Sequence, residues 1–120
     1  MGSTTEPGKP LFDLAELTRR VGGDTELAHD VLVAVIDDSR RLMVDIESAA
    51  AARDSRALRH AAHTMKGCVA NVAAIELAAR AAELEECAAK SDLTVCAPLV
   101  APLRALFERV HDGLAAAAKR

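Results

Sequence analysis

The strongest constraint on the fold of this chain is the spacing of its apolar residues. Between residues 25 and 118 they recur every three or four positions in long segments separated by short polar breaks. Because an α-helix has about 3.6 residues per turn, this spacing places the apolar residues of each segment on one face. Helices are predicted at residues 25–52, from 54 to a break between 71 and 74, from that break to 90, and at 93–118.

These long segments are joined by short connections, which make sequential helices antiparallel neighbours. We therefore predict a single all-α domain over residues 11–120, an antiparallel up-down-up-down four-helix bundle. A short extra helix is predicted from Asp13, a good N-cap, to about Val21, where it would lie across the end of the bundle. Residues 1–10 are rich in Gly, Ser, Thr and Pro and are predicted to be a flexible leader or a cloning remnant.

Two features of the composition support a helical bundle. Alanine and leucine, both strong helix formers, dominate the apolar residues, whereas aromatic residues make up only 2% of the chain.

Pro98 and Pro102 stand in the first half of the last predicted helix, where each removes a backbone donor, so an irregular start or a kink is expected there.

A polar patch on the helix that begins near residue 54 is the candidate for chemistry. His63, Lys66 and Gly67 share one face of a helix, and that face lies opposite the apolar stripe, so His63 should be exposed. Glycine inside a helix costs about 1 kcal/mol relative to alanine, which indicates that a partner approaches closely at Gly67. Lys66 places a cation one turn from the imidazole, as a phosphorylated and strongly negative ring would require.

The run HAAHTMKGCVAN, from His60 to Asn71, resembles the signature of histidine-containing phosphotransfer (Hpt) domains. That signature has a histidine, two further residues, Lys-Gly, a small residue and often an asparagine further on. The matching positions are His63, Lys66, Gly67, Cys68 and Asn71. The family often has a second glycine shortly after the asparagine, where this chain has Val-Ala-Ala. The resemblance covers nearly all of residues 11–120 and implies the same four-helix bundle.

The resemblance implies a phosphorelay intermediate. His63 would accept a phosphoryl group from an aspartate of a receiver domain and pass it to an aspartate of another, with Lys66 supporting the phosphate. A neutral imidazole is a suitable nucleophile because the group titrates near neutral pH. The protein would have no kinase activity, ATP site or cofactor of its own, and the Mg²⁺ would be bound by the receiver. The implied partners are response-regulator receiver domains and a hybrid sensor histidine kinase.

Further residues on the same helix are predicted to dock the partner. They are Arg56, Arg59, His60, Gly67, Ala70 and Asn71. His60 is less suited than His63 to carry the phosphoryl group because no Lys-Gly pair stands three residues after it. The acidic residues of the 25–52 segment are interpreted mainly as a solvated face, although one or two can reach toward His63.

Two other functions stay open. The bundle could be a non-phosphorylated interaction module that binds a signalling partner. It could also hold a metal between His60, His63 and the glutamates Glu83, Glu85 and Glu86, but the Glu-x-x-His motif of bundle metal sites is absent, so no metal is expected.

The remaining features bound the class of protein. A net charge of −3 and the scarcity of aromatic residues argue against nucleic-acid binding. The three dispersed cysteines are interpreted as small buried residues in a reducing compartment. No apolar run reaches the roughly 18–20 residues of a membrane span. We expect a cytoplasmic monomer, or a cytoplasmic domain of a membrane-anchored hybrid kinase.

Overall fold

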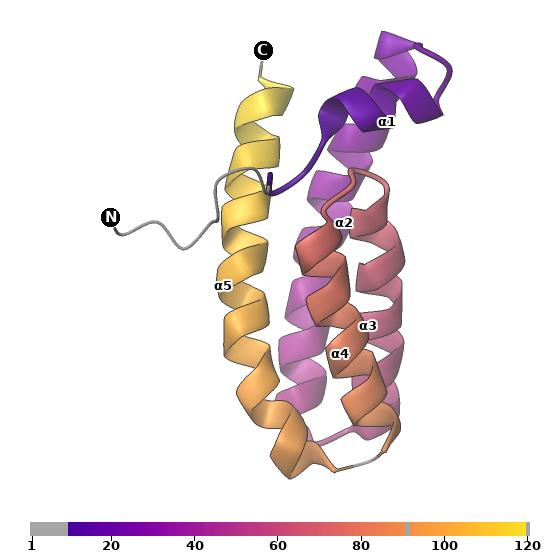
Figure 1. Cartoon of the computed structure of the whole chain (residues 1–120). Coiled ribbons are helices and arrows are strands. Elements are labelled where there is room, and N and C mark those ends of the chain that lie inside the picture. Colours follow the sequence, from indigo (N-terminus) through magenta and orange to yellow (C-terminus); the bar gives the residue numbers. More distant parts are fainter. Residues whose placement is uncertain (1–9, 91, 120) are drawn as a thin grey trace.

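The computed structural model describes residues 10–90 and 92–119, and these residues form helices without any strand (Figure 1). The helices are α1 (Leu14–Arg20), α2 (Thr25–Ala51), α3 (Ser55–Ala70), α4 (Ile75–Ala89) and α5 (Leu93–Ala118). Their order and bounds confirm the predicted bundle of long helices preceded by a short one. The predicted leader, apart from its last residue, lies outside the described residues.

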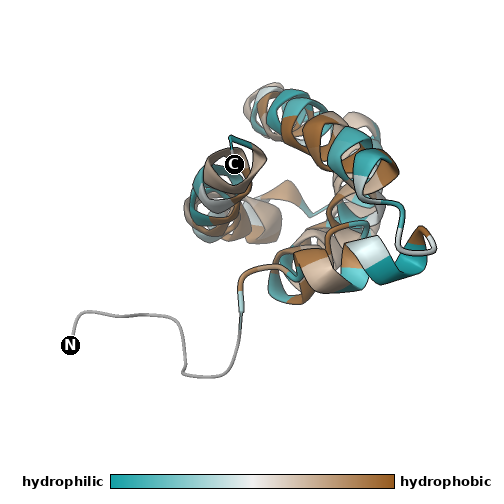
Figure 2. Ribbon diagram, turned by 90° about the horizontal axis from the view of Figure 1, so that it is seen from above, coloured by the Kyte–Doolittle hydropathy of each residue, from teal (hydrophilic) through white to brown (hydrophobic). Residues whose placement is uncertain are grey.

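The long helices pack in the order of the sequence. Each contacts the next, and α5 closes the bundle against α2. Figure 2, which looks along the bundle, shows hydrophobic and hydrophilic residues alternating around the helices. The largest fully buried side chains come from all four long helices and include Met43, Ile46, Leu58, Met65, Leu77, Leu84, Leu103 and Leu114. Each such side chain stabilises the fold by about 1.5–3 kcal/mol.

The buried faces differ in detail from the predicted stripes. In α2, Met43 is buried while Leu42 is only half-buried. In α5, Phe107 and His111 join the core, and their rings pack at a centroid distance of 5.2 Å. The helix is continuous through both prolines, which lie on its exposed side, and Figure 1 shows its first turns inclined to the rest.

Aspartates fix where the first three helices begin. The side chains of Asp13, Asp24 and Asp54 each accept a hydrogen bond of 3.0 Å from the backbone N–H three residues further on. A cap of this kind stabilises a helix by about 1 kcal/mol. The cap at Asp54 defines the start of α3.

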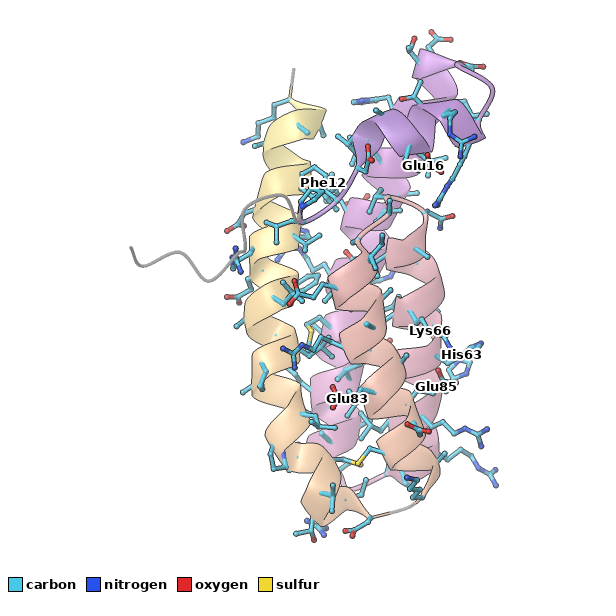
Figure 3. All side chains as sticks on the ribbon, viewed as in Figure 1. Phe12, Glu16, His63, Lys66, Glu83 and Glu85 are labelled. Carbon is cyan, nitrogen blue, oxygen red and sulfur yellow. The ribbon has the colours of Figure 1, made fainter. Side chains whose placement is uncertain are left out.

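The short helix α1 lies across the end of the bundle where α3 leads into α4, as predicted (Figure 1). The backbone N–H of Asp13 donates to the carbonyl of Val72 at 2.8 Å, and the Arg20 guanidinium donates to the carbonyl of Ala70 at 2.8 Å. The segment before α1 packs on α5, because a Cβ added at Gly113 would lie 2.7 Å from the ring of Phe12 (Figure 3). These contacts hold the α3–α4 connection in place.

Within that connection Ala73 has a φ of +54°, a left-handed backbone that favours glycine. Ala73→Gly is expected to raise the free energy of unfolding by up to about 1 kcal/mol. Removing the side chain relieves roughly 1–2 kcal/mol of steric strain, and the greater freedom of unfolded glycine offsets about 0.5–1 kcal/mol of that gain. Urea denaturation measures the difference. Ala74→Gly is the control and should destabilise, because Ala74 is buried at a negative φ; a less stable Ala73→Gly protein would contradict the expectation.

Candidate functional site

His63 lies in the middle of α3 on the side that faces away from the core. The opposite side of the helix is held by the buried residues Leu58, Ala62 and Met65, and 63% of the His63 side chain is exposed. The predicted exposure of His63 is therefore confirmed. Since the packing of the apolar side fixes the rotation of α3, it also fixes the direction in which the imidazole points.

Glu85 of α4, which the sequence analysis considered only as a possible metal ligand, joins His63 and Lys66. Its carboxylate oxygen Oε2 lies 2.9 Å from Nδ1 of His63, and its Oε1 lies 2.8 Å from Nζ of Lys66. Figure 3 shows the three side chains together on the outer side of α3 and α4. Within the described residues, no acidic residue of α2 pairs with His63, in keeping with the interpretation of those residues mainly as a solvated face.

The contact with Glu85 determines which nitrogen of the His63 ring is available. The hydrogen bond from Lys66, and to a smaller extent the one with His63, hold the pKa of the Glu85 carboxyl below its usual value, so this group is ionised at neutral pH. A carboxylate only accepts hydrogen bonds, so a neutral ring beside it carries its proton on Nδ1. The lone pair is then on Nε2, the nitrogen that Glu85 does not contact.

The surface next to the imidazole is open at Gly67. Apart from its two chain neighbours and the adjacent backbone of α3, a Cβ added there would meet no atom of the described residues within 4 Å. Packing within the chain therefore does not require glycine at this position. The missing side chain leaves free space on the face that carries His63 and Lys66.

Apart from Gly67, the predicted docking residues fall into two groups. Arg56, Arg59 and His60 are exposed and line a shallow depression together with His63 and Glu85. This group surrounds the N-terminal side of the imidazole with positive and titratable side chains.

The second group, Ala70 and Asn71, is also exposed but lies at the C-terminal end of α3. The carbonyl of Ala70 accepts a hydrogen bond from the guanidinium of Arg20 in α1. The side-chain amide of Asn71 donates to the carbonyls of Gly67 and Cys68 at 3.4 and 3.1 Å. These bonds satisfy carbonyls that a helix end leaves without partners. Asn71 therefore has a structural role in ending α3.

Two further expectations concern metals and membranes. No group of three histidine, cysteine or acidic side chains able to hold a metal ion occurs within residues 10–90 and 92–119. None of the helices in these two ranges has the length and apolar character that crossing a bilayer demands.

Comparison with known proteins agrees with this fold. The family model of the Hpt domain matches residues 30–113 of this chain. The crystal structure of histidine-containing phosphotransfer protein B (HptB) from Pseudomonas aeruginosa PAO1 is similar, with a TM-score of 0.82 and 29% sequence identity. That match covers 92% of this chain and 96% of the HptB chain. No curated protein matches this chain.

The chain belongs to the Hpt domain family, since the family model matches more than half of its length. Hpt domains are phosphocarriers rather than kinases, and they work with receiver domains and histidine kinases in two-component phosphorelays. The function of this chain is accordingly histidine phosphotransfer within a phosphorelay.

Proposed function

We propose that His63 is the phosphoryl carrier and that it moves the group from an aspartate of one receiver domain to an aspartate of a second. The observation that carries this proposal is the environment of the imidazole. Its Nδ1 is anchored by Glu85 at 2.9 Å, and 63% of the side chain is exposed, so Nε2 is the nitrogen free to meet a partner.

In the first step, the Nε2 lone pair attacks the phosphorus of the aspartyl phosphate. A nitrogen–phosphorus bond forms, the phosphorus–oxygen bond to the aspartate breaks, and the aspartate leaves as a carboxylate. The ring gains positive charge during the attack, and the Glu85 carboxylate on Nδ1 stabilises that charge. The second step is the reverse reaction with the aspartate of the next receiver.

Lys66 has two partners in this scheme. In the resting protein its ammonium group pairs with Glu85 at 2.8 Å and neutralises the carboxylate that orients the ring. Once the phosphoryl group is attached to Nε2, the same ammonium group balances the phosphoryl oxygens, because charge-assisted bonds of this kind are strong. Without Lys66, the negative charge of Glu85 would face the incoming phosphoryl group alone.

The partner supplies the rest of the chemistry. Phosphoryl transfer requires a metal ion that neutralises the developing charge, and we propose that the receiver domain holds this Mg²⁺. The chain itself would need no ATP and no cofactor. Its donor would be a receiver attached to a hybrid sensor kinase, and it would act as a monomer, because a single bundle encloses one filled core.

A two-receiver relay assay tests this proposal. The reduced full chain is mixed with a phosphorylated receiver domain and Mg²⁺, repurified, and then mixed with a second, unphosphorylated receiver. The proposal predicts acid-labile, base-stable label first on the chain and then on the second receiver. If several receivers bind the chain but none transfers label to it, the interaction-module function replaces the proposal.

Gly67 provides a test that separates docking from folding. Gly67→Ala is expected to raise the free energy of unfolding by about 0.5–1 kcal/mol, because alanine is the better helix former and its Cβ meets nothing in the chain. The same methyl group would obstruct a close partner, and we expect the second-order rate of transfer to fall about tenfold, equivalent to roughly 1.4 kcal/mol. Thermal melting measures the change in stability, and transfer reactions quenched at successive times measure the change in rate. A variant that is more stable and equally fast would remove Gly67 from the docking surface.

Glu85 is expected to act as a positioning residue. Glu85→Gln removes the charge but keeps the size, and the introduced amide is able to donate to Nδ1 as well as accept from it. We expect ¹⁵N NMR of the neutral His63 ring to change from one tautomer to a mixture. The transfer rate should fall about tenfold, since a charge-assisted bond of roughly 1.5–3 kcal/mol is replaced by a neutral bond of about 0.5–1.5 kcal/mol.

Glu83→Gln is the matched control for this experiment. It changes the same residue type on the same helix, and within the described residues Glu83 pairs with neither His63 nor Lys66. The control should leave both the tautomer and the rate as in the wild type. An unchanged tautomer in Glu85→Gln would refute the positioning role.

A further inference from the structure

We propose that Cys87 and Cys96 form a reversible thiol–disulfide modification site, oxidised by hydroperoxides, at the end of the bundle where α4 leads into α5. This site is separate from His63 and does not depend on phosphotransfer. It corrects the expectation that all three cysteines are buried, because Cys68 and Cys87 are half-buried and only Cys96 is fully buried.

The topology brings the two thiols together. Cys87 lies in the last turns of α4 and Cys96 in the first turns of α5, and these two helices pack against each other after a short connection. Cys87 contacts the core cluster to which Cys96 belongs. Burial and, after it, a hydrogen bond between the two thiols raise the pKa of Cys96 to about 12. Cys96 therefore stays a thiol at neutral pH, with Cys87 as the neighbouring thiol.

The two sulfurs differ in access to solvent. A depression on the surface is lined by Cys87 and Lys90 of α4 and by Val95 and Leu99 of α5, the residues that flank Cys96 in the helix. Cys96 itself is only 1% exposed. A small oxidant can therefore reach Cys87 from this depression, whereas Cys96 is closed to solvent.

The proposed chemistry has two steps. A hydroperoxide transfers an oxygen atom to the sulfur of Cys87, giving a sulfenic acid and releasing the alcohol, or water when the oxidant is hydrogen peroxide. The thiol of Cys96 then attacks that sulfur, the sulfur–sulfur bond forms, and the hydroxyl group leaves as water with the thiol proton. A dithiol reductant reverses the bond by exchange.

Cys68 supplies an internal contrast. It is half-buried on α3, and burial followed by the charge of Asp38 raises its pKa to about 11, which disfavours the reactive thiolate. The neighbouring groups that act on it do not include another thiol. The same oxidant should therefore leave Cys68 reduced under conditions that convert Cys87.

Peptide mapping tests the proposal on the full chain. The reduced protein is treated with one equivalent of hydrogen peroxide, remaining thiols are alkylated, and the product is digested with trypsin. Each cysteine falls in its own peptide, at residues 67–80, 81–90 and 91–104. We expect a loss of two hydrogens per chain, a bond between the second and third peptides, and alkylation in the first.

Two variants and one spectrum make the result decisive. Cys68→Ser should form the same bond, whereas Cys96→Ser should show higher oxidation of Cys87 or a link between chains. Circular dichroism of the oxidised protein should retain the helical signal. Three alkylated cysteines after peroxide treatment, a bond that includes residues 67–80 in similar yield, or loss of helix on oxidation would each overturn the proposal.

Discussion

His63→Gln is expected to abolish phosphoryl acceptance altogether. The glutamine amide has no nucleophilic nitrogen lone pair, so no nitrogen–phosphorus bond can form at this position. The fold should survive, because the side chain is 63% exposed on the outer face of α3 and surface substitutions usually change stability by less than about 0.5 kcal/mol. The variant is incubated with a receiver domain that carries a labelled phosphoryl group and with Mg²⁺. Gel separation then measures how much label reaches the variant.

His60→Gln is the matched control for this substitution. His60 lies one turn before His63 on the same exposed face, but no lysine or glycine follows it at the spacing found after His63. The control should accept the phosphoryl group at a rate within about threefold of the wild type, a change of roughly 0.6 kcal/mol in the barrier. Label that persists in His63→Gln and disappears in His60→Gln would assign the carrier to His60.

The second large effect is expected at Lys66. Lys66→Ala should slow transfer by roughly 10- to 100-fold, because a hydrogen bond to a charged group contributes about 1.5–3 kcal/mol. Two losses act in the same direction. The phosphoryl oxygens lose their cation, and the carboxylate of Glu85, now without the ammonium group at 2.8 Å, repels the incoming phosphate.

The origin of the Lys66 effect can be separated by a second substitution. In Lys66→Ala combined with Glu85→Gln, the repulsive charge is removed, so the double variant should lose less rate than the product of the two single-variant losses. Lys119→Ala, which removes an exposed lysine after the end of α5, controls for net charge and should transfer normally. A Lys66→Ala protein that transfers as fast as the Lys119→Ala protein would contradict the role assigned to Lys66.

Much of this fold was predictable from local sequence signals. The spacing of apolar residues predicted the long helices, and the N-cap at Asp13 predicted where the short helix begins, as its bond to the N–H of Glu16 confirms. The helical phase of α3 also predicted that His63 would be exposed and that Leu58 and Met65 would be buried. Such signals depend only on residues within a few turns of each other.

The features that escaped prediction depend on how helices fit against one another. Glu85 stands 22 residues after His63, and its contact depends on the rotation and axial register of α4 against α3, which the packed core determines. The proximity of Cys87 and Cys96 also depends on how two helices pack. In the sequence these cysteines were interpreted as separate small buried residues. Ala73 escaped for a different reason, since it occupies the left-handed position of a helix C-cap, in which the N–H of Ala74 donates to the carbonyl of Val69 at 3.2 Å, and that position is usually glycine.

The central claim, that His63 carries the phosphoryl group on the nitrogen opposite Glu85, is tested most directly by locating the group itself. The chain is phosphorylated by a receiver domain, and the product is examined under alkaline conditions by ³¹P NMR and by peptide mass mapping that preserves phosphohistidine. We predict a single phosphohistidine, at His63 and on Nε2. Phosphorylation on Nδ1 of His63, at His60, or at no histidine would contradict this account.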